Sequence, residues 1–458
     1  MNSDAPTQGF RHEAQQLSRL SLPLIVAQGG VTLMGAVDAL IIGQVSALEM
    51  AAVSLGNGLV SMFLGIGIGL ALGIEPLVGQ AFGGERYNDA RSWLWQGLWV
   101  CLFVSPALIL LIIGAAFLLE PFGISLELAE RARAYIWPRL VGVPIVFFCI
   151  ATRAYLSNIS RPKAALYAAI VSNIANVILD LWFVHGWGVV PPLGAEGIAW
   201  STTFCFLFVL LVQCQSIFSI WKKKEDFGDS LEWGERPIVV RLRKTFKTGW
   251  PIGLHMLAEM GVFSFVSTLI ARMGEVSLAA HQIAISLASV TFMGAVGIAN
   301  ATTARVGNHV GASATAGARR AGFVGFIMGG SFMGIAGSCF YIFAEALAGL
   351  FTQDQDVAQV AANLLRIAGV FAVADGFQVV AGGALRGAGD TKWPFMANFV
   401  GHWVIGLPVG IYAVFQRDSG PAGYWWGLTV GLCFVAIVLA IRFERLSAKP
   451  IQRLSLPP

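Results

Sequence analysis

The sequence VGQAFGGERYNDAR, residues 78–91, aligns without a gap on VGNHVGASATAGAR, residues 306–319, in the second half of the chain. Five of the aligned positions are identical, and the offset between the two segments is 228 residues. At the same offset, Pro23 matches Pro251. Several matches in one register predict an internal duplication, so the chain consists of two related halves.

The rest of the chain is strongly apolar. Of its 458 residues, 56% are hydrophobic and only 12% are charged, and the mean hydropathy is +0.71. An ordinary soluble domain has roughly 25% charged residues, which cover its surface. The composition therefore excludes a soluble enzyme, a nucleic-acid-binding protein and a disordered scaffold, and it predicts a polytopic membrane protein.

The apolar residues fall into twelve segments, the first near residues 20–42 and the last near residues 421–443. A membrane-spanning helix needs about 20 mostly apolar residues, so each segment predicts one transmembrane helix. We predict an all-α protein of twelve transmembrane helices in two pseudo-symmetric six-helix lobes. The predicted parts are an N-terminal lobe (1–221), a cytoplasmic linker (222–248) and a C-terminal lobe with a cytoplasmic tail (249–458).

The basic residues predict the orientation of this arrangement. Because each half has an even number of spans, both halves insert the same way round, which predicts a parallel repeat with a substrate site between the lobes. One side of the membrane holds 24 of the 30 Lys and Arg residues, and Arg139 is among the six on the other side. The side rich in Lys and Arg is normally cytoplasmic. We therefore place both termini and the linker in the cytoplasm, and we read the net charge of +4 as a record of topology.

Five acidic residues lie within or at the end of predicted spans: Asp38, Glu75, Asp180, Glu259 and Asp375. A charge at the bilayer centre costs about 2.5–3.5 kcal/mol. We find no Lys or Arg deep enough in a span to pair with them. A buried carboxyl of this kind takes up a proton or binds a cation, which predicts cation or proton coupling. For Glu75, at the membrane edge, a structural or interfacial role is an equal alternative.

The duplication does not extend to these charges. At the repeat offset, four of the acids correspond to valines: Asp38 to Val266, Glu259 to Val31, Asp180 to Val409 and Asp375 to Val146. The helices are repeated but their acidic residues are not. The acids therefore serve something other than holding the helices together.

Polar neighbours add detail to one of these acids. Asn176 and Asp180 are four residues apart, so they share one face of a helix. Their amide and carboxylate oxygens are hard ligands that suit a small cation. Thr202 in the next span adds a hydroxyl, although Asn176 and Thr202 alone are weak signals because polar residues often bond across membrane helices.

Other polar residues are weaker candidates. Glu75, His255 and Gln282 are possible cavity residues, but His255, Gln282 and His281 are more commonly packing residues in such positions. The six cysteines lie in apolar segments without a CxxC pair, so we expect no cofactor and no metal beyond a transported Na⁺.

Two prolines predict bends in the helices. Pro23 and Pro251 each lie in the first third of a span, where a proline removes a backbone hydrogen bond and bends the helix. A static kink and a moving hinge are equal alternatives.

Several longer segments resemble those of the multidrug and toxic compound extrusion (MATE) transporters, and within them the NorM-like bacterial branch. The segments are MGAVDALIIGQVSALEMAAVSLGN (34–57), the VGQAFG and RVGNHVG pair, AAHQIA (279–284) and DGFQVVAGGALRGAGDTK (375–392). Each is weak alone, but together they are specific, and the resemblance covers essentially the whole chain.

The resemblance implies drug export across the bacterial inner (plasma) membrane, driven by inward Na⁺ or H⁺. It makes Asp38 a coupling residue and matches Glu259 and Asp375 to an acidic cation site in the C-terminal lobe. The N-terminal-lobe cation site of the archaeal and DinF-like branches is matched by Asn176, Asp180 and Thr202. Because this chain carries elements of both sites, the coupling ion and the principal lobe stay open.

We therefore expect a monomeric antiporter, surrounded by membrane lipids, that exports cationic, amphipathic drugs by alternating access. The alternative is a lipid or lipid-linked oligosaccharide flippase of the same superfamily. Its anionic cargo fits poorly with acidic intramembrane residues. A membrane enzyme would need clustered His or paired aspartate motifs, and none is present in the sequence, so we expect no enzyme and no nucleic-acid partner.

Overall fold

The computed structural model describes residues 9–186, 188, 191–222, 234–417 and 419–454, and the elements in these ranges are helices. Twelve helical segments are long and apolar enough to cross a membrane. The predicted all-α class with twelve transmembrane helices is therefore confirmed. Residues 223–233 of the predicted linker lie outside the described residues.

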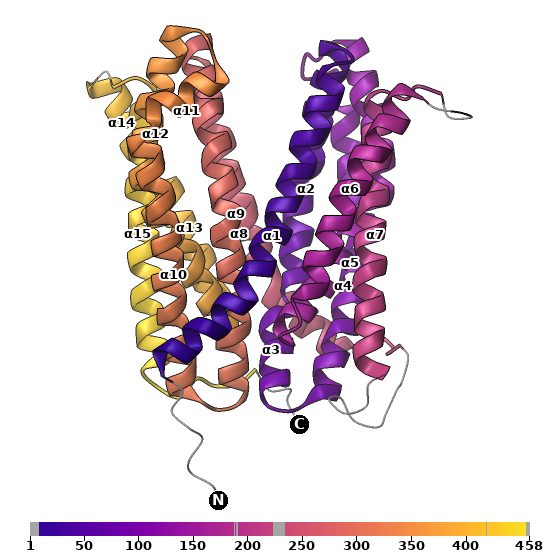
Figure 1. Ribbon diagram of the computed structural model, residues 1–458, viewed down its shortest axis with the longest axis vertical. Helices are drawn as coiled ribbons and strands as arrows, with labels where there is room; N and C mark the ends of the chain where they lie inside the picture. Colours follow the sequence, from indigo (N-terminus) through magenta and orange to yellow (C-terminus); the bar gives the residue numbers. More distant parts are fainter. Residues whose placement is uncertain (1–8, 187, 189–190, 223–233, 418, 455–458) are drawn as a thin grey trace, which may run out of the picture. The chain divides into compact units, whose positions relative to one another are not determined.

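The helices follow the chain in two series, coloured from indigo to yellow in Figure 1. The first half contains α1 (Phe10–Gly43), α2 (Ala47–Leu72), α3 (Glu75–Gly83), α4 (Tyr87–Phe117), α5 (Leu126–Asn158), α6 (Lys163–His185) and α7 (Ala195–Lys222). The second half contains α8 (Val239–Ala271), α9 (Glu275–Gly311), α10 (Thr315–Ile342), α11 (Ala344–Phe351), α12 (Gln355–Gly387), α13 (Lys392–Phe399), the π-helix η1 (Val400–Gly406), α14 (Leu407–Arg417) and α15 (Pro421–Ser447). Two spans are composite, because α2 continues into α3 and because α13, η1 and α14 form one span.

The chain forms two compact units. The C-terminal unit contains the described residues of 9–25, 83–85 and 254–454, and the N-terminal unit contains those of 26–82 and 86–253. Two helices, α1 and α8, each contribute to both units. The change of unit comes three residues after Pro23 in α1 and three residues after Pro251 in α8. The prolines predicted to bend the helices thus mark the points where these helices leave one unit for the other.

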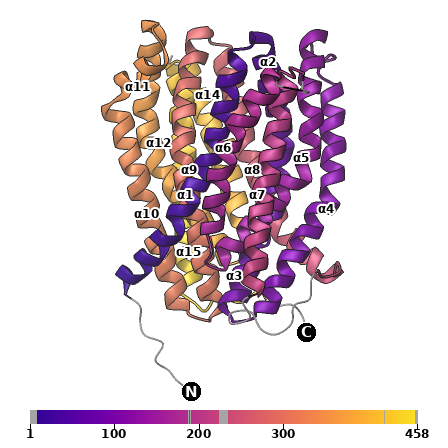
Figure 2. The ribbon, with the colours of Figure 1, turned by 45° about the vertical axis from the view of Figure 1, so that its right-hand side comes forward.

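Within each unit, glycines let helices approach backbone to backbone. In the C-terminal unit, a Cβ atom built at Gly337 of α10 would lie 2.3 Å from the carbonyl oxygen of Gly369 in α12. Figures 1 and 2 show these two helices side by side. In the N-terminal unit, a Cβ atom at Gly69 of α2 would lie 2.1 Å from the backbone nitrogen of Gly253 in α8. Small residues at such crossings permit close packing of membrane helices.

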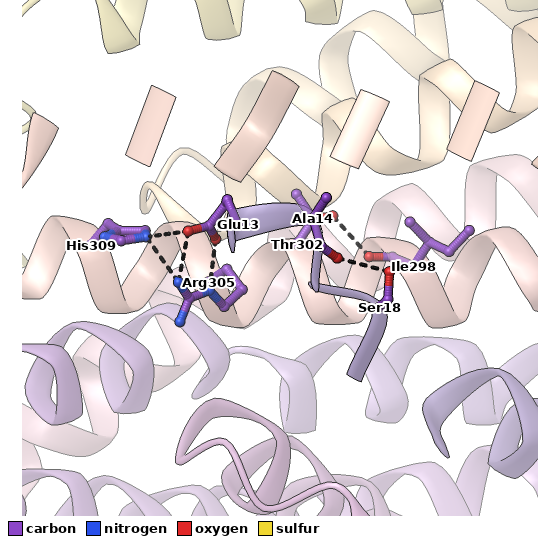
Figure 3. Close-up of polar contacts among 7 residues, drawn as sticks. All are labelled: Glu13, Ala14, Ser18, Ile298, Thr302, Arg305 and His309. Carbon is purple, nitrogen blue, oxygen red and sulfur yellow. Dashed lines mark hydrogen bonds and ion pairs between the residues drawn. The ribbon is translucent and has the colours of Figure 1, made fainter. Parts of the chain in front are cut away.

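The first turn of α1 is tied to α9 by a buried ion pair, shown in Figure 3. Arg305 donates from Nε to Oε1 of Glu13 at 2.7 Å and from Nη2 to Oε2 at 2.8 Å. The Nε2 atom of His309 lies 3.2 Å from the same Oε2. A two-pronged arginine–carboxylate pair is a strong, directional contact. Glu13 therefore holds the first part of α1 in the C-terminal unit, where Leu17, among other residues, packs in the core.

Candidate functional site

In the N-terminal unit, three predicted residues from three helices meet. Asn176 of α6 donates from Nδ2 to Oδ1 of Asp38 in α1 at 2.9 Å. The hydroxyl of Thr202 in α7 lies 3.2 Å from Oδ2 of Asp38 and 2.8 Å from the carbonyl oxygen of Ile198. A hydroxyl has one hydrogen, so Thr202 donates to only one of these oxygens at a time. Asp38 is thus fixed by donors from two other helices and is 8% exposed.

Asp180 lies one turn after Asn176 on α6 and is fully buried. Neither of its carboxylate oxygens accepts a hydrogen bond of ordinary geometry from the described residues, and Oδ1 of Asn176 has no donor either. Asp180 also interacts electrostatically with Asp38. Two carboxylates that share a buried site repel each other, so a proton or a cation between them lowers the free energy. The surplus of acceptor oxygens favours the same occupants.

The sequence analysis missed two residues of this cluster, both on α5. Tyr135 is 2% exposed, and its hydroxyl donates to Oδ1 of Asn57 at 3.4 Å. Arg139 is 8% exposed, and its charge acts on Asp38 and Tyr135. The expectation that no basic residue lies deep enough to reach the acids is therefore wrong for Asp38. Its cause is the length of α5, which begins at Leu126, so that Arg139 is several turns inside the helix.

In the C-terminal unit, the predicted acids Glu259 and Asp375 lie in a second cluster. Gln378 of α12 donates from Nε2 to Oε1 of Glu259 in α8 at 3.1 Å. His255, one turn earlier on α8, has its Nε2 atom 3.6 Å from Oε2 of Glu259, which is an ion-pair distance only if the imidazole is protonated. Asp375 is 5% exposed and interacts electrostatically with Glu259. Arg386, further along α12, acts on both His255 and Glu259.

The remaining candidates have different surroundings. Glu75, at the start of α3, is 2% exposed and interacts electrostatically with Arg153 of α5, a contact that the sequence analysis did not foresee. His281 is fully buried with both ring nitrogens engaged, since Trp425 donates to Nδ1 at 3.2 Å and Ser267 lies 2.8 Å from Nε2. Gln282 is exposed. Its role in a cavity stays a prediction.

A cavity of about 790 Å³ in the C-terminal unit lies away from the acids. Its walls come from α10, α12 and α15, and they include Gly334, Val373 and Ile437 but none of the predicted site residues. Among the described residues, no group of three or more His, Cys, Asp or Glu side chains is placed to hold a metal ion. The polar chemistry of the described chain therefore concentrates in the two acidic clusters.

Comparisons with known proteins agree with this arrangement. The family model described as MatE matches twice, over residues 23–182 and 251–412. The second match begins at Pro251, where the first begins at Pro23, which is the predicted repeat offset of 228 residues. The predicted duplication is therefore confirmed by a family model that recognises each half separately.

Curated and solved proteins match along nearly the whole chain. The "Multidrug resistance protein NorM" of Photobacterium profundum is 30% identical over 451 residues, which are 95% of this chain and 96% of that protein. The crystal structure of the eukaryotic MATE transporter AtDTX14 has a TM-score of 0.85 at 19% identity and covers 97% of this chain and 100% of its own. The Vibrio cholerae MATE transporter VcmN, solved as an aspartate-to-asparagine mutant, has a TM-score of 0.86 at 17% identity and covers 96% of this chain and 99% of its own. The solved structures show that the fold is shared.

Proposed function

This chain belongs to the MATE family of transporters, and we propose that it is a secondary active multidrug efflux antiporter. It exports cationic, amphipathic drugs in exchange for Na⁺ or H⁺. The name of the NorM relative supports multidrug export, and family membership places the chain among transporters rather than enzymes. The twelve apolar helices make it a multi-pass membrane protein.

One observation carries the coupling part of this proposal. Asp38 is fixed by Asn176 and Thr202, while the neighbouring Asp180 is buried without a hydrogen bond of ordinary geometry from the described residues. This cluster is stable only when its excess negative charge is balanced. An entering Na⁺ or H⁺ balances it, and an organic cation is attracted by the same charge. Ion and drug therefore compete.

Competition becomes transport when the ion binds two conformations unequally. A ligand shifts a conformational equilibrium only by the difference between its affinities for the two states. We propose that ion binding at Asp38 and Asp180, or at Glu259 and Asp375, favours the conformation that releases drug. Na⁺ and H⁺ both fit the carboxylate and amide oxygens of these clusters. The helix bends at Pro23 and Pro251 are the proposed flexible points.

The cellular setting is part of the proposal. The NorM relative is bacterial, which supports the bacterial inner membrane. The excess of Lys and Arg on one side supports cytoplasmic termini. We propose that the protein works as a monomer, because each unit has its own acidic cluster.

The direct test is transport by the purified protein in lipid vesicles. Vesicles with an imposed Na⁺ gradient, an imposed pH gradient or neither are loaded with a fluorescent cationic dye, and the initial rate of dye movement is measured. We expect at least one gradient to drive transport and Asp38→Asn to abolish the driven part. Transport that ignores both gradients, or normal driven transport by Asp38→Asn, contradicts the proposal.

A further inference from the structure

Two buried polar residues of the C-terminal unit have no hydrogen-bonding partner among the described residues. Asn398 lies in α13 and His402 in the π-helix η1, and both are fully buried. Both side-chain polar atoms of Asn398 and both ring nitrogens of His402 lack a hydrogen bond within the described part of the chain. A buried polar atom without a partner costs about 1–3 kcal/mol, so four such atoms on two residues are not explained by packing.

Their helix is held in place on one side by close contacts with α15. A Cβ atom built at Gly401 would lie 2.3 Å from Cγ2 of Val435, and one at Gly406 would lie 2.9 Å from the carbonyl oxygen of Gly427. A short π-helix inside a longer helix is frequently found at functional sites. The contacts with α15 are apolar or made by backbone, so they leave the polar side chains of this span to its other neighbours.

On its other side, η1 meets the stripe of α8 that carries an acid of the second cluster. His255, Glu259 and Phe263 are spaced by four residues and lie on one face of α8. The ring of His402 lies 6.1 Å from the ring of Phe263. The adjacent Trp403 donates from Nε1 to the carbonyl oxygen of Ala258 at 3.0 Å. His402 also interacts electrostatically with His255.

We propose that His402 carries protons to and from the carboxyls of Glu259 and Asp375, with Asn398 in the same polar chamber. This inference rests on the proposed function and adds a residue to it. One ring nitrogen of His402 takes a proton while the other releases one to a carboxylate, so one proton moves and no electrons do. Imidazole suits this task because its two nitrogens exchange roles on protonation.

The charges around His402 agree with a transient carrier. From α8 it is faced by His255 and Glu259, and from α12 the cluster is completed by Asp375 and Arg386. Arg386 opposes a lasting positive charge on the imidazole, and the two carboxylates accept its proton. Imidazole nitrogen is a poor ligand for a hard cation such as Na⁺, so the chamber is proposed to handle H⁺.

The test compares His402→Gln with His281→Gln in the same vesicles. Glutamine keeps hydrogen-bonding atoms but does not titrate, and His281 is the matched control because it is equally buried with both nitrogens bonded. We expect His402→Gln to lower pH-driven dye export about tenfold or more, the lower range for a lost acid–base group, while Na⁺-driven export and dye affinity are kept. His281→Gln should keep the pH profile of the unchanged protein.

The outcomes separate this inference from the proposed function. If neither gradient drives the unchanged protein, the proposed function fails. Dye binding to purified protein at a series of pH values then decides about His402 by itself, because an identical profile for His402→Gln overturns the inference. The same holds if both gradients are affected equally, or if only Na⁺ drives the unchanged protein. Should His402→Gln not yield monodisperse protein, Asn398→Leu is measured instead, and a normal pH profile for that variant overturns the proposal.

Discussion

The two acidic clusters hold their charge in different ways. In the N-terminal unit, Asn176 and Thr202 reach Asp38 from two helices. In the C-terminal unit, Gln378 reaches Glu259, while the imidazole of His255 stays 3.6 Å away. The first carboxylate is fixed by its donors, whereas the second is held by fewer bonds in a chamber with several polar atoms that lack a bond within the described residues. One cluster is therefore organised before an ion arrives, and the other has room to change partners.

The difference is instructive because the two halves share a scaffold. The positions equivalent to these acids are valines, and their surroundings differ. Val266, equivalent to Asp38, is 1% exposed in a core with Phe371, whereas Val31, equivalent to Glu259, is 47% exposed. Duplication supplied the helices, and each half acquired its own polar residues afterwards.

The largest effect is expected where an acid is forced into the wrong half. Val266→Asp places an unpaired charge in the apolar core and should lower the free energy of unfolding by about 3–5 kcal/mol, as for a buried pair that has lost one partner. Thermal unfolding in detergent measures it. Val31→Glu is the matched control, since its exposed position should tolerate the charge. A Val266→Asp protein as stable as the unchanged one would mean that both halves accept an acid at this position.

The next effect concerns the less completely bonded acid. Glu259→Gln removes the charge but keeps the size, and it weakens a single charge-assisted hydrogen bond worth about 1.5 kcal/mol. Gradient-driven export should therefore fall about tenfold, less than for Asp38→Asn, since about 1.4 kcal/mol corresponds to a factor of ten. Initial rates in vesicles give the ranking. The reverse order would make the C-terminal cluster the principal ion site.

A smaller effect is expected from one donor of the N-terminal cluster. Thr202→Val keeps the shape of the side chain but removes the hydroxyl beside Asp38, which should destabilise the protein by about 1 kcal/mol. Thermal unfolding and the ion concentration for half-maximal export are both measured. Thr203→Val is a neighbouring control, because its hydroxyl bonds to a backbone carbonyl rather than to an acid. Equal changes in ion dependence for both variants would contradict a specific role for Thr202.

The smallest effect is expected from the donor of the C-terminal cluster. Gln378→Met removes the bond to Glu259, but it also removes Oε1, which has no partner among the described residues. Loss of an unpaired polar atom offsets loss of the bond, so stability should change by less than about 0.5 kcal/mol. Export should still fall, because Glu259 loses its donor. A clear loss of stability would show that the Gln378 bond is structurally as important as those to Asp38.

Much of the fold follows from the sequence, because hydropathy and the repeat are properties of the chain itself. The span count, the duplication and the proximity of Asn176 and Asp180 all rest on local spacing. Arg139, Tyr135, Asn398 and His402 were missed for a physical reason. In a membrane helix the lipid-facing and core-facing sides are both apolar, so periodicity does not show which side is inside. Residues of distant helices are brought together by packing that spacing alone does not encode.

The exchange of helix ends has a consequence for synthesis. The first part of α1 leaves the ribosome early, but its partners in the C-terminal unit are made much later, and Glu13 and Arg305 are 292 residues apart. Until α9 is inserted, the buried carboxylate of Glu13 has to be satisfied by water or lipid headgroups. The amino-terminal end of the protein therefore reaches its final place only when translation is well into the second half of the chain.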